Sequence, residues 1–396
     1  MPETPQERTS RRKTPPSGGH ANRMSGIGYV YGIDLVRFAA ALLVTGFHLT
    51  WRDPAVAGAM WSGWAGVQVF FVVSGFVIAN SANNATPIAF IRSRLLRLYP
   101  AAWVCSVLCL AVLLLMPEPD ANLARRFIAS FALAPDGPYI ASAYWTLPVE
   151  IAFYAAVFLL LLSGHFHRLP QFALALAAAG SAYLGAYSLH VFGVLDLPFL
   201  EFEYGMLNMT LLRHGVFFAL GIFLWLWSRG KLTRTGLAAA LLALAAAPLE
   251  ITARSVEFVE RSPVPLNLAD VWMSPLLIWG LSLLAIAASA RWRADIAALP
   301  PPVLALLRLV GLATYPLYLL HEVVGGAAKA LAMQAGASSM AGAVTGGALS
   351  IAVALLVAAV LEPAVRGWLR RLLDIPQAAF SDRPALSTLY RSGGTV

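Results

Sequence analysis

The fold is decided by the stretch Leu35–Trp51, LVRFAAALLVTGFHLTW, in which nearly every side chain suits the interior of a lipid bilayer. Two side chains do not suit it, Arg37 and His48. Because eleven residues make about three helical turns plus 20°, both lie on one face of a helix, roughly 16 Å apart along its axis. A charged side chain within the apolar slab normally faces the interior of a helical bundle, so it is a candidate functional residue by default.

Composition places the whole chain among membrane proteins. Hydrophobic residues make up 59% of the 396 residues, charged residues make up 12%, and the mean hydropathy is +0.70. A soluble domain carries about twice that charged fraction. Runs of about 17 to 25 apolar residues are long enough to span a bilayer. They predict an all-α polytopic membrane protein with about ten transmembrane helices, at 33–51, 61–81, 100–116, 145–162, 172–190, 209–228, 236–253, 270–289, 303–322 and 339–363.

The basic residues predict the orientation of these spans. With the N-terminus inside and the loops assigned alternately, 19 of the 28 Lys and Arg residues fall on the inner side, six on the outer side and three within spans. Cytoplasmic loops carry an excess of Lys and Arg, so both termini are predicted to be cytoplasmic. The same asymmetry accounts for the net charge of +8, which therefore does not require a nucleic-acid partner.

Three parts of the chain differ in composition. Residues 1–28 are polar and rich in Pro, Ser and Arg, which predicts a disordered cytoplasmic tail without a secretory signal. Residues 29–372 hold the apolar spans of the transmembrane domain, and 373–396 form a second polar cytoplasmic tail. Cys105 and Cys109 share one helical face, where a mutual disulfide would be strained, so both are expected to be small structural thiols. No metal site is expected.

Several polar side chains are predicted at one depth of the membrane. His48 lies roughly 22 Å up a slab about 30 Å thick. Glu150 lies about five residues below the outer edge, on a helix that runs from the outside to the inside. His321 lies at the outer end of a helix that runs from the inside to the outside. Arg213 and His214 enter at a comparable depth. The groups near the inner edge are Arg37, Glu362, Arg92, Arg94 and Arg97.

These residues also have ordinary structural interpretations. Arg37 can snorkel to the inner interface and pair with Asp34 one turn earlier. His48 or His321 can be a buried histidine bonded to a backbone carbonyl. Charge alone would make the inner arginines a stop-transfer flank, and Trp145 would pass as an interfacial aromatic residue. However, two histidines and a carboxylate at one depth, above a basic inner mouth, favour an acid–base site joined to an anion site.

Six segments resemble the membrane acyltransferase-3 family, whose members O-acylate bacterial surface polysaccharides and some secreted small molecules. In chain order they are DLVRFAAALLVTGFH (34–48), GVQVFFVVSGFVI (66–78), FIRSRLLRLYP (90–100), YWTLPVEIAFY (144–154), ATYPLYLLHEVV (313–324) and LEPAVRGWL (361–369). This is the order of the family's motifs. The chain departs from the family pattern at Gln68, where many relatives carry Asp, at Thr146, where Ser is usual, and at Glu322, where a small residue is common.

The resemblance implies an O-acyltransferase that takes an acyl group, in the simplest case acetyl, from cytoplasmic acyl-CoA. His48 is expected to be the general base, because the unperturbed pKa of histidine, about 6.5, lies near working pH. An acyl-histidine relay is the minor variant. Glu150 would orient or polarise His48, His321 would donate to the oxyanion or to the acceptor hydroxyl, and Arg37 would hold the thioester arm of the donor or a carboxylate of the core.

Donor and acceptor are expected to bind at opposite ends of this site. The arginines expected at the donor phosphates are Arg92, Arg94 and Arg97. The aromatic residues expected to contact substrate are Trp145, Tyr315 and Tyr318. The resemblance implies no tightly bound cofactor, a carbohydrate acceptor and a place in the bacterial inner membrane. Two alternatives stay open, a secreted small-molecule acceptor such as a macrolide, and a glycolipid transporter, which would usually show a repeated half that this sequence lacks.

Overall fold

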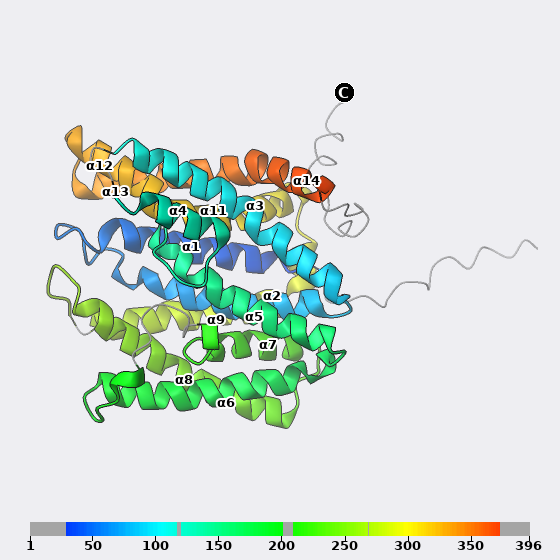
Figure 1. Cartoon of the computed structure of the whole chain (residues 1–396). Coiled ribbons are helices and arrows are strands. Elements are labelled where there is room, and N and C mark those ends of the chain that lie inside the picture. The colour runs from blue at the N-terminus through cyan, green and yellow to red at the C-terminus, as the bar shows by residue number, and fades with distance from the viewer. Residues whose placement is uncertain (1–28, 117–119, 201–208, 268, 373–396) are drawn as a thin grey trace, which may run out of the picture.

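The apolar runs fold as long helices that lie roughly side by side (Figure 1). The computed structural model of the chain describes residues 29–116, 120–200, 209–267 and 269–372, and within these ranges it contains helices and no strands. The two tails predicted at 1–28 and 373–396 lie outside the described residues.

Fourteen α-helices follow one another in the described chain. They are α1 (Tyr31–Thr50), α2 (Gly66–Ala82), α3 (Pro87–Leu114), α4 (Leu123–Ala132), α5 (Thr146–Leu162), α6 (Leu169–Val191), α7 (Gly215–Ser228), α8 (Arg234–Val259), α9 (Ser274–Arg291), α10 (Arg293–Ala297), α11 (Pro301–Leu320), α12 (Gly326–Gln334), α13 (Ser339–Leu356) and α14 (Glu362–Leu372).

Nine helical segments of the described chain are long and apolar enough to cross a membrane. They correspond to nine of the ten predicted spans, and several of them join an α-helix to a neighbouring short helical turn. The tenth span, predicted at 209–228, is shorter than expected. Its helix α7 has 14 residues and begins only at Gly215, because 209–214 form turns around the buried side chain of Arg213. The prediction of an all-α polytopic membrane protein is confirmed.

The structure differs from the predicted spans in two further places, at α4 and at the end of α8. Helix α4 is short and carries Arg125 and Arg126, so a search for long apolar runs does not detect it. Helix α8 continues to Val259, well beyond the alanine-rich run at 236–253. Arg254 and Glu257, which were predicted to lie in an outer loop, are therefore helical residues.

The turns between helices alternate between two ends of the bundle (Figure 1). The α2–α3, α5–α6 and α7–α8 turns lie at one end, called the basic end here, together with α14. The α1–α2 and α8–α9 connections lie at the opposite end, called the far end. Arg97 lies 3.8 Å from Glu362 in the basic half, and Lys329 Nζ donates to Leu49 O at 2.8 Å near the far end. This arrangement agrees with the predicted alternation of loops.

Helices α1 and α2 occupy the centre of the bundle. With its preceding turn, α2 has 83% of its apolar stretch buried, against 22–50% in the other spans. Small residues allow its close approach to α7, because a Cβ atom on Gly75 would lie 2.2 Å from Phe218 O. On the other side of α1, a Cβ atom on Gly311 would lie 2.2 Å from the Asp34 carboxyl carbon. Helix α1, which carries Arg37 and His48, thus packs closely against α11.

Candidate active site

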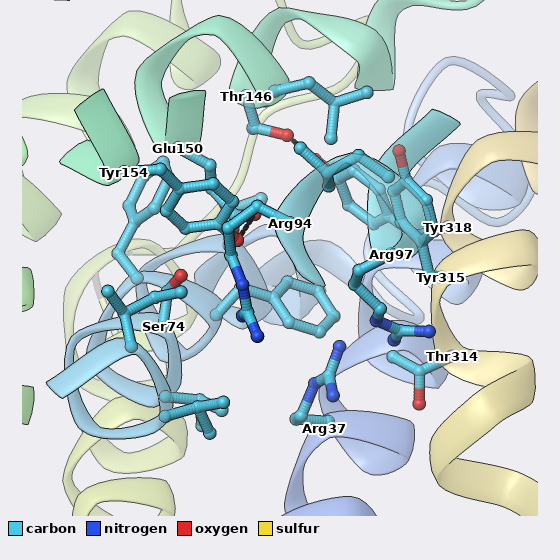
Figure 2. A pocket seen from close by; sticks show the side chains of 18 residues that line it. Arg37, Ser74, Arg94, Arg97, Thr146, Glu150, Tyr154, Thr314, Tyr315 and Tyr318 are labelled. Carbon is cyan, nitrogen blue, oxygen red and sulfur yellow. Dashed lines mark hydrogen bonds between the residues drawn. The ribbon is translucent and has the colours of Figure 1, made fainter. Parts of the chain in front are cut away.

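Three arginines converge on one cavity in the basic half of the bundle (Figure 2). Arg37 comes from α1, Arg94 and Arg97 come from α3, and Glu150 of α5 is the one acidic residue among its described lining residues. The cavity encloses about 760 Å³ of empty space. Three guanidinium groups against one carboxylate leave an excess of positive charge, which suits an anionic ligand. It is called the arginine cavity below.

Arg92 lies apart from the other two arginines of its motif. Residues three apart on a helix share a face, whereas residues two apart do not. Arg94 and Arg97 therefore face the same way, and Arg92 lines neither the arginine cavity nor the hollows next to it. The structure thus separates Arg92 from the predicted group of three.

Arg37 is not paired with Asp34. The Asp34 carboxylate instead accepts a hydrogen bond from the Tyr29 hydroxyl, and its Oδ2 lies 3.4 Å from Arg308 Nη1. Arg37 forms no ion pair with any residue in the described ranges, and its side chain points into the arginine cavity. The alternative in which Asp34 neutralises a snorkelling Arg37 therefore does not describe this structure.

Arg97 is held from two sides. Its Nη1 lies 3.8 Å from a carboxylate oxygen of Glu362, the glutamate of the closing motif. Its guanidinium carbon lies 5.7 Å from the centre of the Tyr315 ring. These contacts position the guanidinium at the cavity wall, and one buried amino group, Nη1, has no hydrogen-bond partner among the described residues.

Glu150 belongs to the arginine cavity and does not lie beside the catalytic histidine candidate. Its Oε2 accepts a hydrogen bond of 2.7 Å from the Tyr154 hydroxyl, and the Tyr154 ring in turn faces Arg94 at 6.0 Å. His48 lines a different cavity, which Glu150 does not reach. The predicted pairing of Glu150 with His48 is therefore corrected. Helix α5 begins at Thr146, and Glu150, in its first two turns, lines the arginine cavity (Figure 2).

A second hollow continues the arginine cavity toward the basic end. Arg37, Arg94 and Arg97 line both spaces, and the second one encloses about 750 Å³. Asp34, from the first turn of α1, and Arg308, from the N-terminal half of α11, line its other side. The arginines thus stand between the basic end and the middle of the bundle.

His48 lines a separate cavity of about 800 Å³, called the histidine cavity below. Val67 and Tyr318 line both this cavity and the arginine cavity, so the two spaces share a wall made by these side chains. The aromatic residues that line the histidine cavity besides Tyr318 are Phe47, Trp51, Trp64, Trp145 and Phe258. Arg37 and His48, on one face of α1, therefore serve two adjoining spaces.

His321 lies behind His48 as seen from the cavity. The centres of the two rings are 5.0 Å apart, and His321 is completely buried at the start of a π-helical turn, His321–Gly325. His321 Nδ1 lies 3.2 Å from Leu317 O. A carbonyl oxygen only accepts, so Nδ1 carries the proton and Nε2 of the neutral ring keeps a lone pair. Nε2 has no partner among the described residues. A neutral His321 is thus an acceptor at Nε2, whereas it was predicted to donate.

Glu322 follows His321 directly, in the same π-helical turn. Its charge acts on both His48 and His321, and its Oε2 accepts a hydrogen bond of 2.6 Å from the Ser142 backbone. In the sequence, Glu322 stands out only as a departure from the family pattern. Its position directly after His321, at the end of an apolar helix, is the signal that could have identified it.

A larger hollow of about 1380 Å³ lies on the far side of the histidine cavity. Arg52, Ser142 and Trp145 line both spaces, and Glu322 lines the hollow. The four spaces therefore form a row from the basic end to the far end, and each shares lining residues with the next.

The rim of this outer hollow carries groups of both charges. The backbone N–H of Asn122 and the Arg126 guanidinium hold the pKa of Asp120 below its usual value. Burial, with the charge of Asp136, raises the pKa of Tyr139 to about 12. At neutral pH this rim therefore presents an ionised Asp120 paired with Arg126 and a neutral Tyr139.

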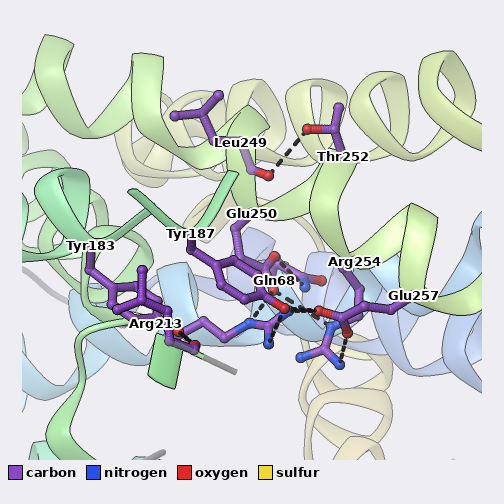
Figure 3. A network of polar contacts seen from close by, with 10 residues as sticks. Gln68, Tyr183, Tyr187, Arg213, Leu249, Glu250, Thr252, Arg254 and Glu257 are labelled. Atoms are coloured by element: carbon purple, nitrogen blue, oxygen red, sulfur yellow. Dashed lines mark hydrogen bonds and ion pairs between the residues drawn. The ribbon is translucent and has the colours of Figure 1, made fainter. Parts of the chain in front are cut away.

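A buried ion-pair network supports the histidine cavity from one side (Figure 3). Arg213 lies 3.3 Å from Glu250 and 2.5 Å from Glu257, and Arg254 lies 2.8 Å from Glu257. Gln68 of α2 donates from Nε2 to Glu250 at 3.0 Å. Two arginines and two glutamates balance in charge, and the network ties α2 and the turn before α7 to α8. The sequence alone does not identify these partners of Arg213, because they lie on a helix far from it in the chain.

The predicted aromatic substrate contacts are divided between the cavities. Trp145 lines the histidine cavity and the outer hollow, Tyr315 lines the arginine cavity, and Tyr318 lines both cavities. Thr146 Oγ1 donates to the Tyr318 hydroxyl at 3.2 Å. Within the described ranges no group of three or more His, Cys, Asp or Glu side chains is arranged to hold a metal ion.

Comparison with known proteins supports one family. The model of the acyltransferase-3 family, described as an acyltransferase domain, matches residues 30–361. The chain is 28% identical over 314 residues to "Exopolysaccharide production protein ExoZ" of Rhizobium meliloti (strain 1021), covering 74% of this chain and 88% of that protein. It is 28% identical over 221 residues to "Putative membrane-bound transacylase BcsY" of Komagataeibacter xylinus, covering 51% and 52%. No solved structure matches the chain.

Proposed function

Because the chain belongs to the acyltransferase-3 family and is a membrane acyltransferase, we propose that it moves an acyl group from cytoplasmic acyl-CoA to a hydroxyl of a cell-envelope or exopolysaccharide sugar. Acetyl is the simplest acyl group for this role. The similarity to ExoZ, an exopolysaccharide production protein, supports a polysaccharide acceptor. The proposal places the protein in the bacterial inner membrane, where it would join a cytoplasmic donor to an external acceptor.

The observation that carries the proposal is the row of adjoining spaces through the bundle. The spaces lined by Arg37, Arg94 and Arg97 extend toward the basic end, and the space lined by His48 adjoins the outer hollow. Cytoplasmic ends of membrane helices are rich in Lys and Arg. A donor from the cytoplasm and an acceptor from outside would thus approach His48 from opposite sides.

The donor side of the site suits the phosphates of CoA. Guanidinium groups bind phosphate oxygens through charge-assisted, often two-pronged hydrogen bonds. Arg94 and Arg97 point into the arginine cavity from one face of α3, and Arg37 joins them without an ion-pair partner of its own among the described residues. In the proposed complex these side chains bind the donor, and its thioester arm passes the shared wall at Tyr318 to reach His48.

The chemical step is assigned to His48. Its imidazole takes the proton of the acceptor hydroxyl, and the oxygen attacks the thioester carbonyl to form a tetrahedral intermediate. The intermediate then collapses with cleavage of the carbon–sulfur bond, and the thiolate of CoA takes the proton back from the imidazolium. The products are an ester of the acceptor and free CoA, so atoms and charge balance without any further reactant.

His321 and Glu322 act through His48 in this proposal. The centre of the His321 ring lies 5.0 Å from that of His48, and its buried Nε2 is an acceptor without a partner among the described residues. Catalytic hydrogen bonds often tighten only when the substrate is bound. The negative charge of Glu322 stabilises the imidazolium that forms during proton transfer. Both are therefore positioning residues. The oxyanion donor is left to groups that bind with the substrates.

The test of the proposal uses the purified full-length chain in lipid nanodiscs. Acetyl-CoA is supplied with an exopolysaccharide fragment, free CoA is measured with a thiol reagent, and the glycan product is analysed by mass spectrometry. Acceptor-dependent CoA release together with an added acetyl mass on the glycan supports the proposal. Transfer to a macrolide but not to any glycan would replace the acceptor class, and absence of CoA release with every acceptor would refute the assignment of acyl-CoA as donor.

A further inference from the structure

The histidine cavity is rich in arginine as well as in aromatic residues. Arg52, Arg254 and Arg261 line it together with His48, and none of its described lining residues is a carboxylate. Aromatic rings offer flat apolar surfaces, and guanidinium groups recognise carboxylate and phosphate. The chemistry of the wall therefore differs from that expected for a neutral ligand.

Two buried polar atoms in this wall have no hydrogen-bond partner among the described residues. They are Trp64 Nε1, a donor, and Gln68 Oε1, an acceptor. Both side chains are only 3% exposed. Buried polar groups are nearly always satisfied, so such a pair indicates a ligand or water that supplies the missing partners. A sugar hydroxyl can accept from the one and donate to the other.

The arginines of the cavity differ in their own partners. Arg254 is already engaged by Glu250 and Glu257, whose charges balance Arg213 and Arg254. Arg52 is exposed where the histidine cavity meets the outer hollow, and it forms no ion pair with any described residue. Its guanidinium lies 4.8 Å from the centre of the Trp51 ring, which fixes it beside an aromatic surface. Arg52 thus presents, at the mouth of the cavity, a guanidinium that no described carboxylate pairs with.

We propose that the histidine cavity is the binding site of an acidic saccharide. The sugar ring lies against the tryptophans, hydroxyl groups meet Trp64 Nε1 and Gln68 Oε1, and an anionic substituent, a carboxylate or a phosphate, pairs with Arg52. This inference rests on the proposed function in taking the saccharide as the acyl acceptor. It adds that the acceptor is anionic and that Arg52 selects it.

The experiment measures binding, which does not depend on acyl transfer. Full-length protein in nanodiscs is titrated calorimetrically with three disaccharides: cellobiose, cellobiouronic acid and cellobiose phosphate. One charge-assisted contact is worth roughly tenfold or more in affinity. At least one of the acidic sugars should therefore bind about tenfold more tightly than cellobiose, and this preference should weaken with salt. Tight binding of cellobiouronic acid would identify the anionic substituent as a carboxylate, and tight binding of cellobiose phosphate would identify it as a phosphate.

Three variants locate the contacts. Arg52→Gln should remove the preference for the acidic sugars and leave cellobiose binding unchanged. Arg125→Gln is the matched control, because Arg125 is exposed on α4 and lines none of these spaces; it should keep the preference. Trp64→Phe keeps an aromatic ring and removes the N–H group, so it should lower the affinity for all three sugars by the same factor.

Equal binding of neutral and acidic sugars would overturn the inference. So would binding of none of them, or a preference that survives Arg52→Gln. Acyl transfer to cellobiose without a preference for acidic sugars would leave the proposed function standing and remove this inference. A preference that Arg52→Gln abolishes would support the inference even if acyl-CoA proves not to be the donor.

Discussion

Arg37 and His48 stand on one face of α1 but line different cavities. Their separation of about 16 Å follows from the rise of the helix. Val67 and Tyr318 form the wall between the two cavities. One helix therefore presents a cation to the basic half of the bundle and an imidazole to the far half. The proposed reaction needs both, the cation to bind the donor and the imidazole to take the proton of the acceptor.

The role of His48 gives the first prediction at the scale of the residue. His48→Ala should reduce acyl transfer by a factor of about 10²–10⁴, the usual contribution of a general base. Alanine is less costly than histidine in the membrane, so insertion and folding should persist. The measurement is acceptor-dependent CoA release at saturating substrates.

His167→Ala is the matched control for this variant. His167 lies in the exposed α5–α6 connection, away from the cavities, and its removal should leave the rate unchanged. A rate for correctly inserted His48→Ala above about a tenth of the parent rate would show that another group removes the proton.

The arginines of α3 give a second prediction. Arg94→Gln and Arg97→Gln should each raise the KM for acyl-CoA about ten- to a hundredfold with a smaller change in kcat, because the lost contact binds the donor in the ground state as well. Replacing either arginine with lysine should raise the KM less than replacing it with glutamine, since lysine keeps the charge but loses the two-pronged geometry. Steady-state kinetics with varied acyl-CoA test this.

Arg92→Gln serves as the comparison, because Arg92 belongs to the same motif and the same end of the membrane but faces away from the arginine cavity. Its KM should stay within about twofold of the parent value. Equal increases of KM in all three variants would mean that the arginines act through the charge of the whole segment and not through contact.

At the scale of the element, the contact of α2 with α7 depends on the absence of a Cβ atom. Gly75→Ala would place that atom 2.2 Å from Phe218 O and force the two helices apart. We expect a loss of roughly 1–3 kcal/mol in stability, as for other overpacked cores, measured by thermal unfolding in detergent. Gly280→Ala on α9 meets nothing within 4 Å, so it should unfold at the parent temperature or slightly above. Equal unfolding temperatures of the two variants would contradict the close packing.

The buried network makes a second prediction at this scale. Arg213 is 1% exposed and contacts Glu250 and Glu257. Arg213→Met would leave carboxylates buried with less compensation, which typically costs about 3–5 kcal/mol. The expected outcome is a clearly lower unfolding temperature, whereas Arg234→Met at the exposed start of α8 should change little. If both variants unfold alike, the network does not stabilise α8 against its neighbours.

At the scale of the whole molecule, the proposed function requires that the basic end of the row of cavities faces the cytoplasm and the far end faces the outside. A reporter fused after Gly230, in the α7–α8 turn at the basic end, should read as cytoplasmic. A reporter near Glu260, beyond the end of α8, should read as external. Reversed readings at both positions would place His48 near the cytoplasm and would remove the separation of donor and acceptor.

The sequence by itself determined the membrane class, the positions of nine of the ten predicted spans and the shared face of Arg37 and His48. These features depend on residues close together in the chain, because the thickness of the bilayer sets the length of an apolar run and the helical repeat sets the face. The separation of Arg92 from Arg94 was also available from the helical repeat. The unpaired state of Cys105 and Cys109 likewise followed from their spacing, because a disulfide between two residues on one helical face would be strained.

Only the tertiary structure decided which groups meet. Glu150 was the carboxylate predicted to orient His48, but the packing of the bundle places Glu150 among the arginines, and Glu322, in the π-helical turn after α11, is the carboxylate whose charge reaches His48. The partners of Arg213 come from a helix more than thirty residues later in the chain. Depth along a helix is a local property of the sequence, whereas the direction in which a side chain faces its neighbours depends on how all the helices pack together.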